Sequence, residues 1–355
     1  MKLFTVGPVQ MDPAVLEAGA RPLPYFRTAE FSEQMLQMET QFLRLLNAPP
    51  ESRGVFMTAS GTGAMEAAVT SILNPDRDKA LVIDGGSFGH RFAELCELYR
   101  IPYVALQLPF DADLTEERLQ PYREAGFTAL LMQQAETSLG KRYDMTMAGR
   151  FCRHEGLYLI VDAVSSFLCD PLDMTGCGAD VILTASQKAL ALSPGLSLLA
   201  LSPRIIAERL TDQPSRCFYL SLSRALDNMK RGQTPFTPAL SVLEQLAYRL
   251  QQLDQLGLQA ELNQRASLAA YFRQQIRQLP GLRVPGYTLS NSLTPLLTGA
   301  LDAHDLFVDL KDQTGLVVTP NGGTLAHNLL RVGHMGHLVR TDYDALIAAL
   351  KTRLA

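Results

Sequence analysis

The sequence predicts an α/β protein in which a mostly parallel sheet is flanked by helices and is followed by a smaller C-terminal α/β domain. Short β-rich runs alternate with helical stretches from about residue 53 to residue 202, which is typical of βαβ units. A chain of 355 residues also exceeds the usual size of a single core and predicts two domains. The predicted strands are Gly54–Thr58, Ala80–Asp84, Ala129–Gln133, Leu157–Asp162, Val181–Thr184 and Ser197–Leu201.

A long helix is predicted to link the two domains between about residues 238 and 279. Leucines recur there at three- and four-residue intervals, at Leu243, Leu246, Leu250, Leu253 and Leu256. The Pro280-Gly281 turn then begins a region of mixed strand and helix, which ends in the amphipathic stretch Tyr343–Leu354. We therefore expect an N-terminal arm at residues 1–18, a large domain at residues 19–257 and a small domain at residues 258–355.

The composition favours a globular protein that acts on small molecules. Hydrophobic residues make up 47% of the chain and charged residues 19%, a balance that supports a buried core. The formal net charge of -4 gives no general attraction to nucleic acid or to anionic membranes. No apolar run reaches the roughly 18 residues that predict a membrane span, and the first residues do not resemble a signal peptide. We expect neither a nucleic-acid nor a membrane partner.

Cysteine and histidine spacing predicts a cytoplasmic protein without a metal site. The five cysteines are an odd number at irregular spacings, without the CxxC pairs of a disulfide or zinc framework. Reduced thiols are therefore expected. Among the six histidines, His334 and His337 form one close pair, whose spacing is more typical of packing or loop residues than of metal ligands. A metal-dependent hydrolase is accordingly disfavoured.

The segment Ser60-Gly61-Thr62-Gly63 is a candidate phosphate-binding turn between a predicted strand and a helical run that begins around Ala64. Glycines let the backbone approach an anion, hydroxyls donate hydrogen bonds, and a helix N-terminus adds its positive dipole end. A Gly/Ser turn before a helix can equally be a plain N-cap, so this segment alone leaves both interpretations open.

Asp162 is a candidate partner for a protonated ring nitrogen. It ends the apolar run Leu159-Ile160-Val161, where an unpaired buried carboxylate would cost several kcal/mol, on the order given for desolvated ions. A protonated pyridine nitrogen would supply the missing charge, and the pair would keep such a ring an electron sink. A lone Asp at this place is more commonly the cap of the following turn.

Lys188 is a candidate nucleophile that would hold an aldehyde cofactor as a Schiff base. It follows the run Ala179–Ala185 and precedes Ala-Leu-Ala-Leu, surroundings that destabilise an ammonium ion and leave the amine nucleophilic. Most lysines are solvated surface groups, so the assignment of Lys188 depends on the motifs that accompany it. A phosphate-binding turn, a pyridinium partner and a Schiff-base lysine follow one another along the chain in the order that pyridoxal 5'-phosphate enzymes of fold type I require.

The sequence resembles one branch of that fold type, the class V aminotransferases, over nearly its whole length. This branch includes alanine:glyoxylate, serine:pyruvate and 2-aminoethylphosphonate:pyruvate aminotransferases. The matching motifs are Thr5-Val6-Gly7-Pro8, Ser60-Gly61-Thr62-Gly63-Ala64-Met65-Glu66, Gly85-Gly86-Ser87-Phe88-Gly89-His90-Arg91, Glu136-Thr137-Ser138, the Asp162 and Lys188 segments, Thr234-Pro235-Phe236-Thr237-Pro238 and Arg331-Val332-Gly333-His334-Met335-Gly336.

The resemblance implies roles in binding pyridoxal 5'-phosphate. Ser60, Gly61 and Thr62 would bind its phosphate, and Gln187 would reach the same group from just before the lysine. Phe88 would stack on the pyridine ring, where many relatives have a tryptophan that this chain lacks entirely. Thr137 would lie near the ring oxygen.

The resemblance also implies a substrate site and a homodimer. Gly7, Arg27 and Arg331 match its substrate side, and a guanidinium such as that of Arg331 binds a carboxylate through two parallel hydrogen bonds. A surface salt bridge is the alternative role for Arg331. Thr237 resembles a residue that reaches the neighbouring subunit's phosphate, which predicts an obligate homodimer with composite sites.

The expected reaction is transamination by a ping-pong mechanism. The amino donor is expected to be a small amino acid of the alanine or serine type, and the acceptor a 2-oxo acid such as glyoxylate or pyruvate. The alternative is 2-aminoethylphosphonate:pyruvate transamination, because Arg27 is a spare cation near the expected substrate entrance. Cysteine desulfuration needs a thiol on a late loop, and no cysteine follows Cys217. A binding protein on an inactive fold is disfavoured by the intact Lys188 and Asp162.

Overall fold

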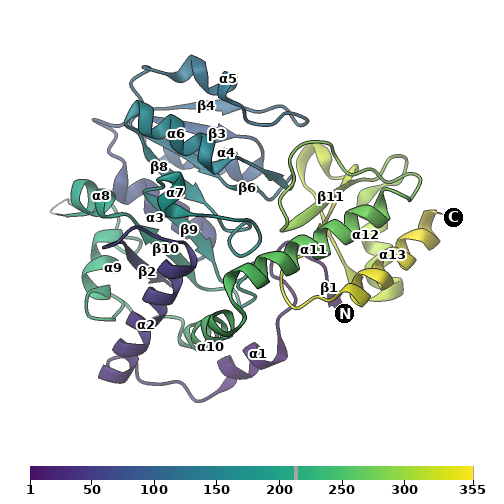
Figure 1. Ribbon diagram of the computed structural model, residues 1–355, viewed down its shortest axis with the longest axis horizontal. Coiled ribbons are helices and arrows are strands. Elements are labelled where there is room, and N and C mark those ends of the chain that lie inside the picture. The colour runs from purple at the N-terminus through teal and green to yellow at the C-terminus, as the bar shows by residue number, and fades with distance from the viewer. Residues whose placement is uncertain (212–214, 355) are drawn as a thin grey trace.

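The computed structural model describes residues 1–211 and 215–354, and its centre is a seven-stranded sheet (Figure 1). The strand order is β2-β10-β9-β8-β5-β3-β4, and only β10 runs antiparallel to its two neighbours. The predicted mostly parallel sheet is therefore confirmed. Its strands are β2 (Arg53–Met57), β3 (Ala80–Asp84), β4 (Tyr103–Gln107), β5 (Ala129–Gln133), β8 (Tyr158–Asp162), β9 (Val181–Ala185) and β10 (Ser197–Leu201).

One strand of this sheet was not predicted. β4 lies at the sheet edge and pairs in parallel with β3 alone, so Tyr103, Val104 and Ala105 stay half-buried. The inner strands are continuous buried apolar runs, which is the pattern expected for strands covered on both faces. The edge strand lacks that pattern, so its sequence did not predict a strand.

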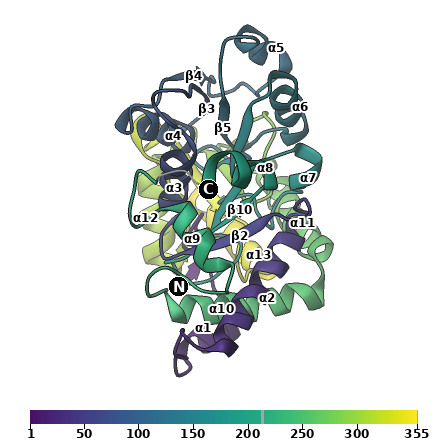
Figure 2. The same ribbon diagram turned by 90° about the vertical axis from the view of Figure 1, so that its left-hand side faces the viewer.

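Helices cover both faces of the large sheet. Figure 2 shows the strands between α3 and α4 on one side and α6 and α7 on the other. The helices of this part are α1 (Pro13–Ala20), α2 (Ala29–Leu45), α3 (Gly61–Ile72), α4 (Ser87–Leu98), α5 (Glu116–Leu119), α6 (Met145–Glu155), α7 (Met174–Cys177), α8 (Pro203–Ile205), α9 (Leu222–Met229) and α10 (Leu240–Leu256). A short hairpin of β6 (Ala135–Glu136) and β7 (Lys141–Arg142) follows β5.

A smaller layer of strands and helices forms a second hydrophobic core. Its antiparallel sheet has the order β11-β14-β13 and packs with α11, α12 and α13. Phe4 from the N-terminal arm belongs to this core, because β1 pairs in parallel with β12. The elements are β1 (Lys2–Leu3), α11 (Leu258–Ile276), β11 (Leu293–Leu297), α12 (Ala303–Thr314), β12 (Leu316–Val317), β13 (Thr319–Pro320), β14 (Leu329–Gly333) and α13 (Arg340–Leu354).

The single long helix predicted between the two parts is wrong. The structure has two helices, α10 and α11, which meet at Gly257. Gly257 has φ 85° and ψ 140°, a conformation that breaks a helix and that glycine adopts without a Cβ penalty. The leucine pattern continues across this residue because each helix buries a leucine face. The domain boundary between residues 257 and 258 stays a prediction.

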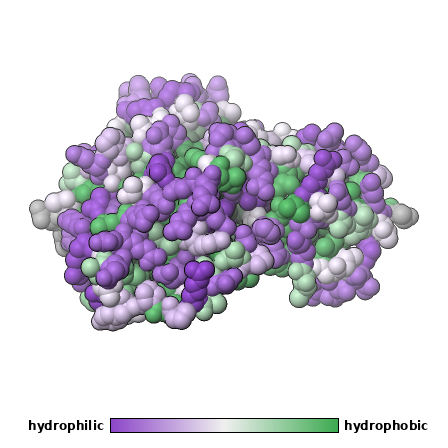
Figure 3. Space-filling view, turned by 60° about the horizontal axis from the view of Figure 1, so that its bottom comes forward, coloured by the Kyte–Doolittle hydropathy of each residue, from purple (hydrophilic) through white to green (hydrophobic). Residues whose placement is uncertain are grey.

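The surface in Figure 3 is mainly hydrophilic, with scattered hydrophobic residues between the polar ones. In residues 1–211 and 215–354, no helix combines the length and the apolar character that crossing a membrane requires.

Candidate active site

Four elements of the large sheet and its helices bring the predicted cofactor residues together. Asp162 ends β8, and the Ser186-Gln187-Lys188 turn follows the neighbouring strand β9. The N-termini of α3 and α4 lie at the same edge and carry Gly61 and Phe88. Ligand sites of open α/β sheets lie at the carboxyl ends of the strands, and the candidate site follows that rule.

Lys188 is a buried lysine whose pKa is low enough for nucleophilic chemistry. Burial, with the nearby charge of Arg331, lowers its pKa from 10.5 to about 8, although Asp162 acts in the opposite direction. Its Nζ donates a hydrogen bond to the Val6 carbonyl at 2.5 Å. A Cβ at Gly7 would lie 2.7 Å from Lys188 Cδ, so the glycine leaves room for the lysine side chain.

Asp162 is a buried carboxylate, and no cationic side chain of the described residues lies within hydrogen-bond distance of it. Burial raises its pKa from 3.8 to about 7, while the Val164 N–H, which donates to its Oδ1 at 2.8 Å, lowers it. A ring N–H⁺ at this carboxylate would restore the charged form, because opposite charges favour each other's ionisation. The geometry therefore fits the predicted pyridinium partner.

The N-terminus of α3 forms a backbone cradle. The helix begins at Gly61, three residues earlier than predicted, and the Ser60 side chain makes no capping hydrogen bond. The amides of the first turn of a helix have no partner inside the helix, so they are available to an anion. A Cβ at Gly61 would lie 2.7 Å from Val164 Cγ2, so glycine lets this turn approach the end of β8.

Gln187 and Thr137 border the same space. Gln187 Oε1 is buried and has no hydrogen-bond partner among the described residues, which marks it as an atom that a bound group could satisfy. Thr137 is buried, and its Oγ1 donates to Ser165 Oγ at 2.9 Å. Phe88 is half-buried on α4, and its ring centroid lies 5.9 Å from Lys188 Nζ.

Arg331 reaches this space from β14 of the smaller part. Its guanidinium donates to the Pro320 carbonyl at 2.8 Å and to the Thr137 carbonyl at 3.3 Å. Its Nε is buried without a partner in residues 1–211 and 215–354. Burial lowers the pKa of Arg331 to about 10, although Glu136 opposes this shift. The guanidinium retains its charge at neutral pH, and its Nε–H is free to donate to a ligand.

Two of the predicted residues lie apart from this cluster. Arg27 is exposed, and it donates to Gln233 Oε1 at 2.9 Å and to the Thr234 carbonyl at 3.0 Å. Thr237 is exposed as well and lies beside Thr234 and Phe236. In the described part of the chain, neither forms a hydrogen bond to Lys188 or Asp162, so their predicted roles stay predictions.

The structure also brings two residues to the site that had no assigned role. Glu136 is fully buried and accepts a hydrogen bond from the Gly89 N–H at 2.9 Å. Arg91 donates to Thr62 Oγ1 at 2.9 Å, and its guanidinium lies 4.7 Å from the centroid of Phe88. Both belong to matching motifs, but nothing in their spacing indicates that they face the site.

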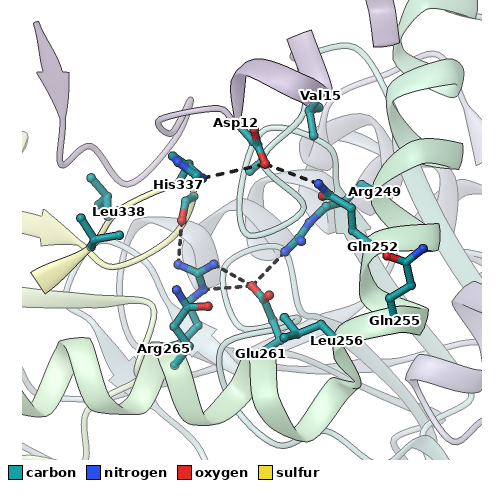
Figure 4. A pocket seen from close by; sticks show the side chains of 14 residues that line it. Asp12, Val15, Arg249, Gln252, Gln255, Leu256, Glu261, Arg265, His337 and Leu338 are labelled. Carbon is teal, nitrogen blue, oxygen red and sulfur yellow. Dashed lines mark hydrogen bonds and ion pairs between the residues drawn. The ribbon is translucent and has the colours of Figure 1, made fainter. Parts of the chain in front are cut away.

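The hollow shown in Figure 4 is a different feature. It lies among α1, α10, α11 and the loop after β14, and the residues that line it do not include Lys188 or Asp162. Glu261 lies in it between Arg249 and Arg265, with Nη2 to Oε1 distances of 2.9 and 2.7 Å. This cluster is an ion-pair network between α10 and α11, next to their junction at Gly257.

Pyridoxal phosphate fits the residues that the site presents. The α3 amides suit a phosphate, whose oxygens the Gln187 side chain could reach only through its amide N–H, while Asp162 suits a ring nitrogen and Lys188 an aldehyde carbon. Gly7 and Gly61 leave open the space that a Cβ would fill. The fold and this set of residues define a pyridoxal-phosphate-dependent enzyme.

Comparisons with known proteins identify the family. The sequence model of the class-V aminotransferases matches residues 24–342, and the chain belongs to this family. The protein is therefore a pyridoxal-phosphate-dependent transaminase of fold type I. The solved alanine–glyoxylate aminotransferase of Nostoc sp. has a TM-score of 0.92 and 25% identity, covering 99% of this chain and 95% of the other.

Curated relatives carry different names at similar identity. The 2-aminoethylphosphonate–pyruvate transaminase of Syntrophobacter fumaroxidans is 27% identical over 98% of this chain and 95% of its own length. The soluble hydrogenase 42 kDa subunit of Anabaena cylindrica is 28% identical over 100% of this chain and 93% of its own length.

Proposed function

We propose that the protein transfers an amino group from a small amino acid of the alanine or serine type to a 2-oxo acid such as glyoxylate or pyruvate. The observation that carries this proposal is Arg331, a charged guanidinium with a buried, unpartnered Nε beside Thr137. Its positive charge is also one of the causes that lower the pKa of Lys188. A single carboxylate anchor near the reactive amine suits a small amino acid and a small oxo acid.

The residues divide the work of the reaction. Pyridoxal phosphate, when bound, supplies an electron sink for negative charge at the substrate's α-carbon. Asp162 would hold a proton at the ring nitrogen, which its buried position favours through charge pairing. Lys188 would move the α-proton, because its lowered pKa keeps a useful fraction of free amine near neutral pH. Arg331 would fix the carboxylate, and Phe88 would cover the ring and exclude water.

The second candidate substrate is 2-aminoethylphosphonate. The relative from Syntrophobacter fumaroxidans supports it, and Arg27 would have to supply a cation for the phosphonate. Arg27 instead donates from its Nη1 to Gln233 Oε1 and to the Thr234 carbonyl, and it makes no hydrogen bond to the Lys188 and Asp162 cluster in the described residues. The geometry therefore favours a monocarboxylate amino donor.

We also propose a homodimer in which Thr237 contributes to the partner's phosphate site. Thr237 is exposed beside an aromatic group of Phe218, Tyr219 and Phe236. Phe218 is 68% and Tyr219 47% exposed, and large exposed aromatic side chains are enriched at interfaces between proteins. The mass of the purified protein by light scattering tests this part, since a monomer at micromolar concentration would contradict it.

A half-reaction screen tests the substrate assignment. Single amino donors are added to the cofactor-loaded protein, and the visible absorbance of the bound cofactor is followed. Alanine or serine is expected to bleach it, whereas 2-aminoethylphosphonate is expected to leave it unchanged. In Arg331→Gln the donor concentration for half-bleaching should rise at least about 30-fold, the scale for loss of a buried charge-assisted pair. Bleaching by 2-aminoethylphosphonate alone would favour the second candidate.

A further inference from the structure

We propose that Arg91 is a further cofactor-binding residue, whose guanidinium binds the cofactor phosphate from the side opposite the α3 backbone. This inference rests on the cofactor and does not depend on which amino acid is the substrate. It adds a cationic ligand to a cradle that otherwise consists of backbone amides, hydroxyls and the Gln187 side chain.

The position of Arg91 follows from the geometry of α4. It lies three residues after Phe88, so both side chains emerge on the same face of the helix. Its guanidinium lies 4.7 Å from the Phe88 centroid, and its Nη1 donates to Thr62 Oγ1 at 2.9 Å. Thr62 is in the first turn of α3, so the cation lies between the ring-stacking residue and the phosphate cradle.

Arg91 differs from two other half-buried arginines of this part of the molecule, Arg53 and Arg209. Arg53 pairs with Glu39 and Arg209 pairs with Asp78, each through a direct ion pair. Within residues 1–211 and 215–354, no carboxylate oxygen forms an ion pair with Arg91, although its side chain is half-buried. A guanidinium has five donors, and the bond to Thr62 uses one of them. The remaining donors suit an oxyanion.

The charges around the site favour an anion beside Arg91. Lys188, Arg91 and Arg331 are cations, while Asp162 and Glu136 are carboxylates, so the cluster has an excess of positive charge. The N-terminus of α3 adds partial positive charge. A phosphate monoester carries about two negative charges near neutral pH and would balance Arg91 and the helix end. The substrate carboxylate would then balance Arg331.

A purely structural role for Arg91 makes a different prediction from phosphate binding. If Arg91 only positions the Phe88 ring and the Thr62 side chain, its loss weakens the binding of every ligand that contains the pyridine ring. If Arg91 binds the phosphate, its loss weakens the binding only of ligands that carry the phosphate. Pyridoxal and pyridoxal phosphate share the ring and the aldehyde and differ in that single group, so they separate the two roles.

The experiment measures dissociation constants of the apoprotein for pyridoxal phosphate and for pyridoxal by absorbance titration. Arg91→Gln should weaken pyridoxal phosphate roughly 10- to 100-fold, the range for one charge-assisted hydrogen-bonded contact, with less than about a twofold change for pyridoxal. Arg91→Lys keeps the positive charge but loses the planar set of guanidinium donors. Its affinity for pyridoxal phosphate should therefore fall less than that of Arg91→Gln, and its affinity for pyridoxal should stay unchanged. Arg118→Gln, at an exposed arginine of α5, should match the wild type.

A second measurement covers the case in which Arg91→Gln folds poorly. Inorganic phosphate should raise the melting temperature of the wild-type apoprotein more than that of Arg91→Lys. If Arg91→Gln lost affinity equally for pyridoxal phosphate and pyridoxal, or kept its affinity for both, the proposal would be overturned. Either result leaves cofactor binding by the wild type intact, so it is distinguishable from failure of the proposed aminotransferase activity.

Discussion

At the scale of single residues, the reactivity of Lys188 depends on burial and on the charge of Arg331. An amine adds to an aldehyde only in its deprotonated form, and the pKa of Lys188 is lowered from 10.5 to about 8. The reactive fraction therefore appears at lower pH than for a solvated lysine. The rate at which the apoprotein captures pyridoxal phosphate should rise with pH around a midpoint near 8 and then level off.

Arg331→Gln provides the control for this pH profile. Removing the guanidinium removes the second cause that lowers the pKa of Lys188, so the midpoint should move to higher pH. Stopped-flow absorbance over a pH series measures both proteins. A wild-type midpoint near the ordinary 10.5, or a midpoint unchanged in Arg331→Gln, would contradict the coupling of these two residues.

The sequence was informative about residues whose role follows from local pattern. Asp162 and Lys188 each follow a buried apolar run, and strand ends meet at one edge of a parallel sheet, so both could be predicted. Arg91 and Glu136 could not, because their partners Thr62 and Gly89 lie 29 and 47 positions away in sequence. Their contacts exist only after α3, α4 and the turn after β5 have packed.

At the scale of elements, the close approach of α3 to β8 depends on Gly61. A Cβ there would lie 2.7 Å from Cγ2 of Val164, a stiff β-branched side chain two residues after Asp162. Gly61→Ala should lower the free energy of unfolding by about 1–3 kcal/mol, the usual cost of overpacking, and should weaken cofactor retention. Chemical denaturation and cofactor content after dialysis measure the two effects.

Gly286→Ala is the matched control, since a Cβ at this position would meet no heavy atom within 4 Å. It should leave both stability and cofactor content unchanged. If Gly61→Ala behaved like Gly286→Ala, close packing of α3 against the end of β8 would not be what shapes the cradle.

Elements were predictable where their pattern was uniform. The buried runs of β3, β5 and β10 have the predicted bounds, because an inner strand is apolar on both faces. The break at Gly257 was missed because leucine periodicity reports which faces are buried and not the backbone angle of one glycine. A glycine within a leucine-rich segment is compatible with a continuous helix. Only the φ of 85° at Gly257 shows that the helix ends there.

At the scale of the whole molecule, Glu261 joins α10 and α11 across Gly257. It is 1% exposed, and its Oε1 contacts the guanidinium groups of both Arg249 and Arg265. Arg265 also donates to the carbonyls of His334 and Gly336, which follow the strand that carries Arg331. The carboxylate thus holds together the helix junction and the segment next to the substrate anchor.

Glu261→Gln should lower the free energy of unfolding by about 3–5 kcal/mol, because it leaves two largely buried cations without their carboxylate. Burial raises the pKa of Glu261, but the two arginines lower it further, so the net pKa lies below 4.5. The stabilisation is therefore complete above about pH 4.5 and is lost as the pH falls through the lower folded pKa.

Denaturation midpoints at pH 7 and at acidic pH measure this contribution. Asp227→Asn, which removes the exposed Lys230–Asp227 pair, is the control and should change stability by less than about 1 kcal/mol. An equally small effect of Glu261→Gln at pH 7 would contradict the role of this network.

The most direct test of the whole account is the chemical identity of the residue that carries the cofactor. The pyridoxal-phosphate-loaded protein is reduced with borohydride and digested, and the modified peptide is identified by mass spectrometry. The account predicts a pyridoxyl adduct on Lys188, and none in Lys188→Ala. Lys141 is the informative comparison, because it too is buried with a lowered pKa but donates to the Pro109 and Ala112 carbonyls. An adduct on Lys141, or no adduct on Lys188, would contradict the central claim.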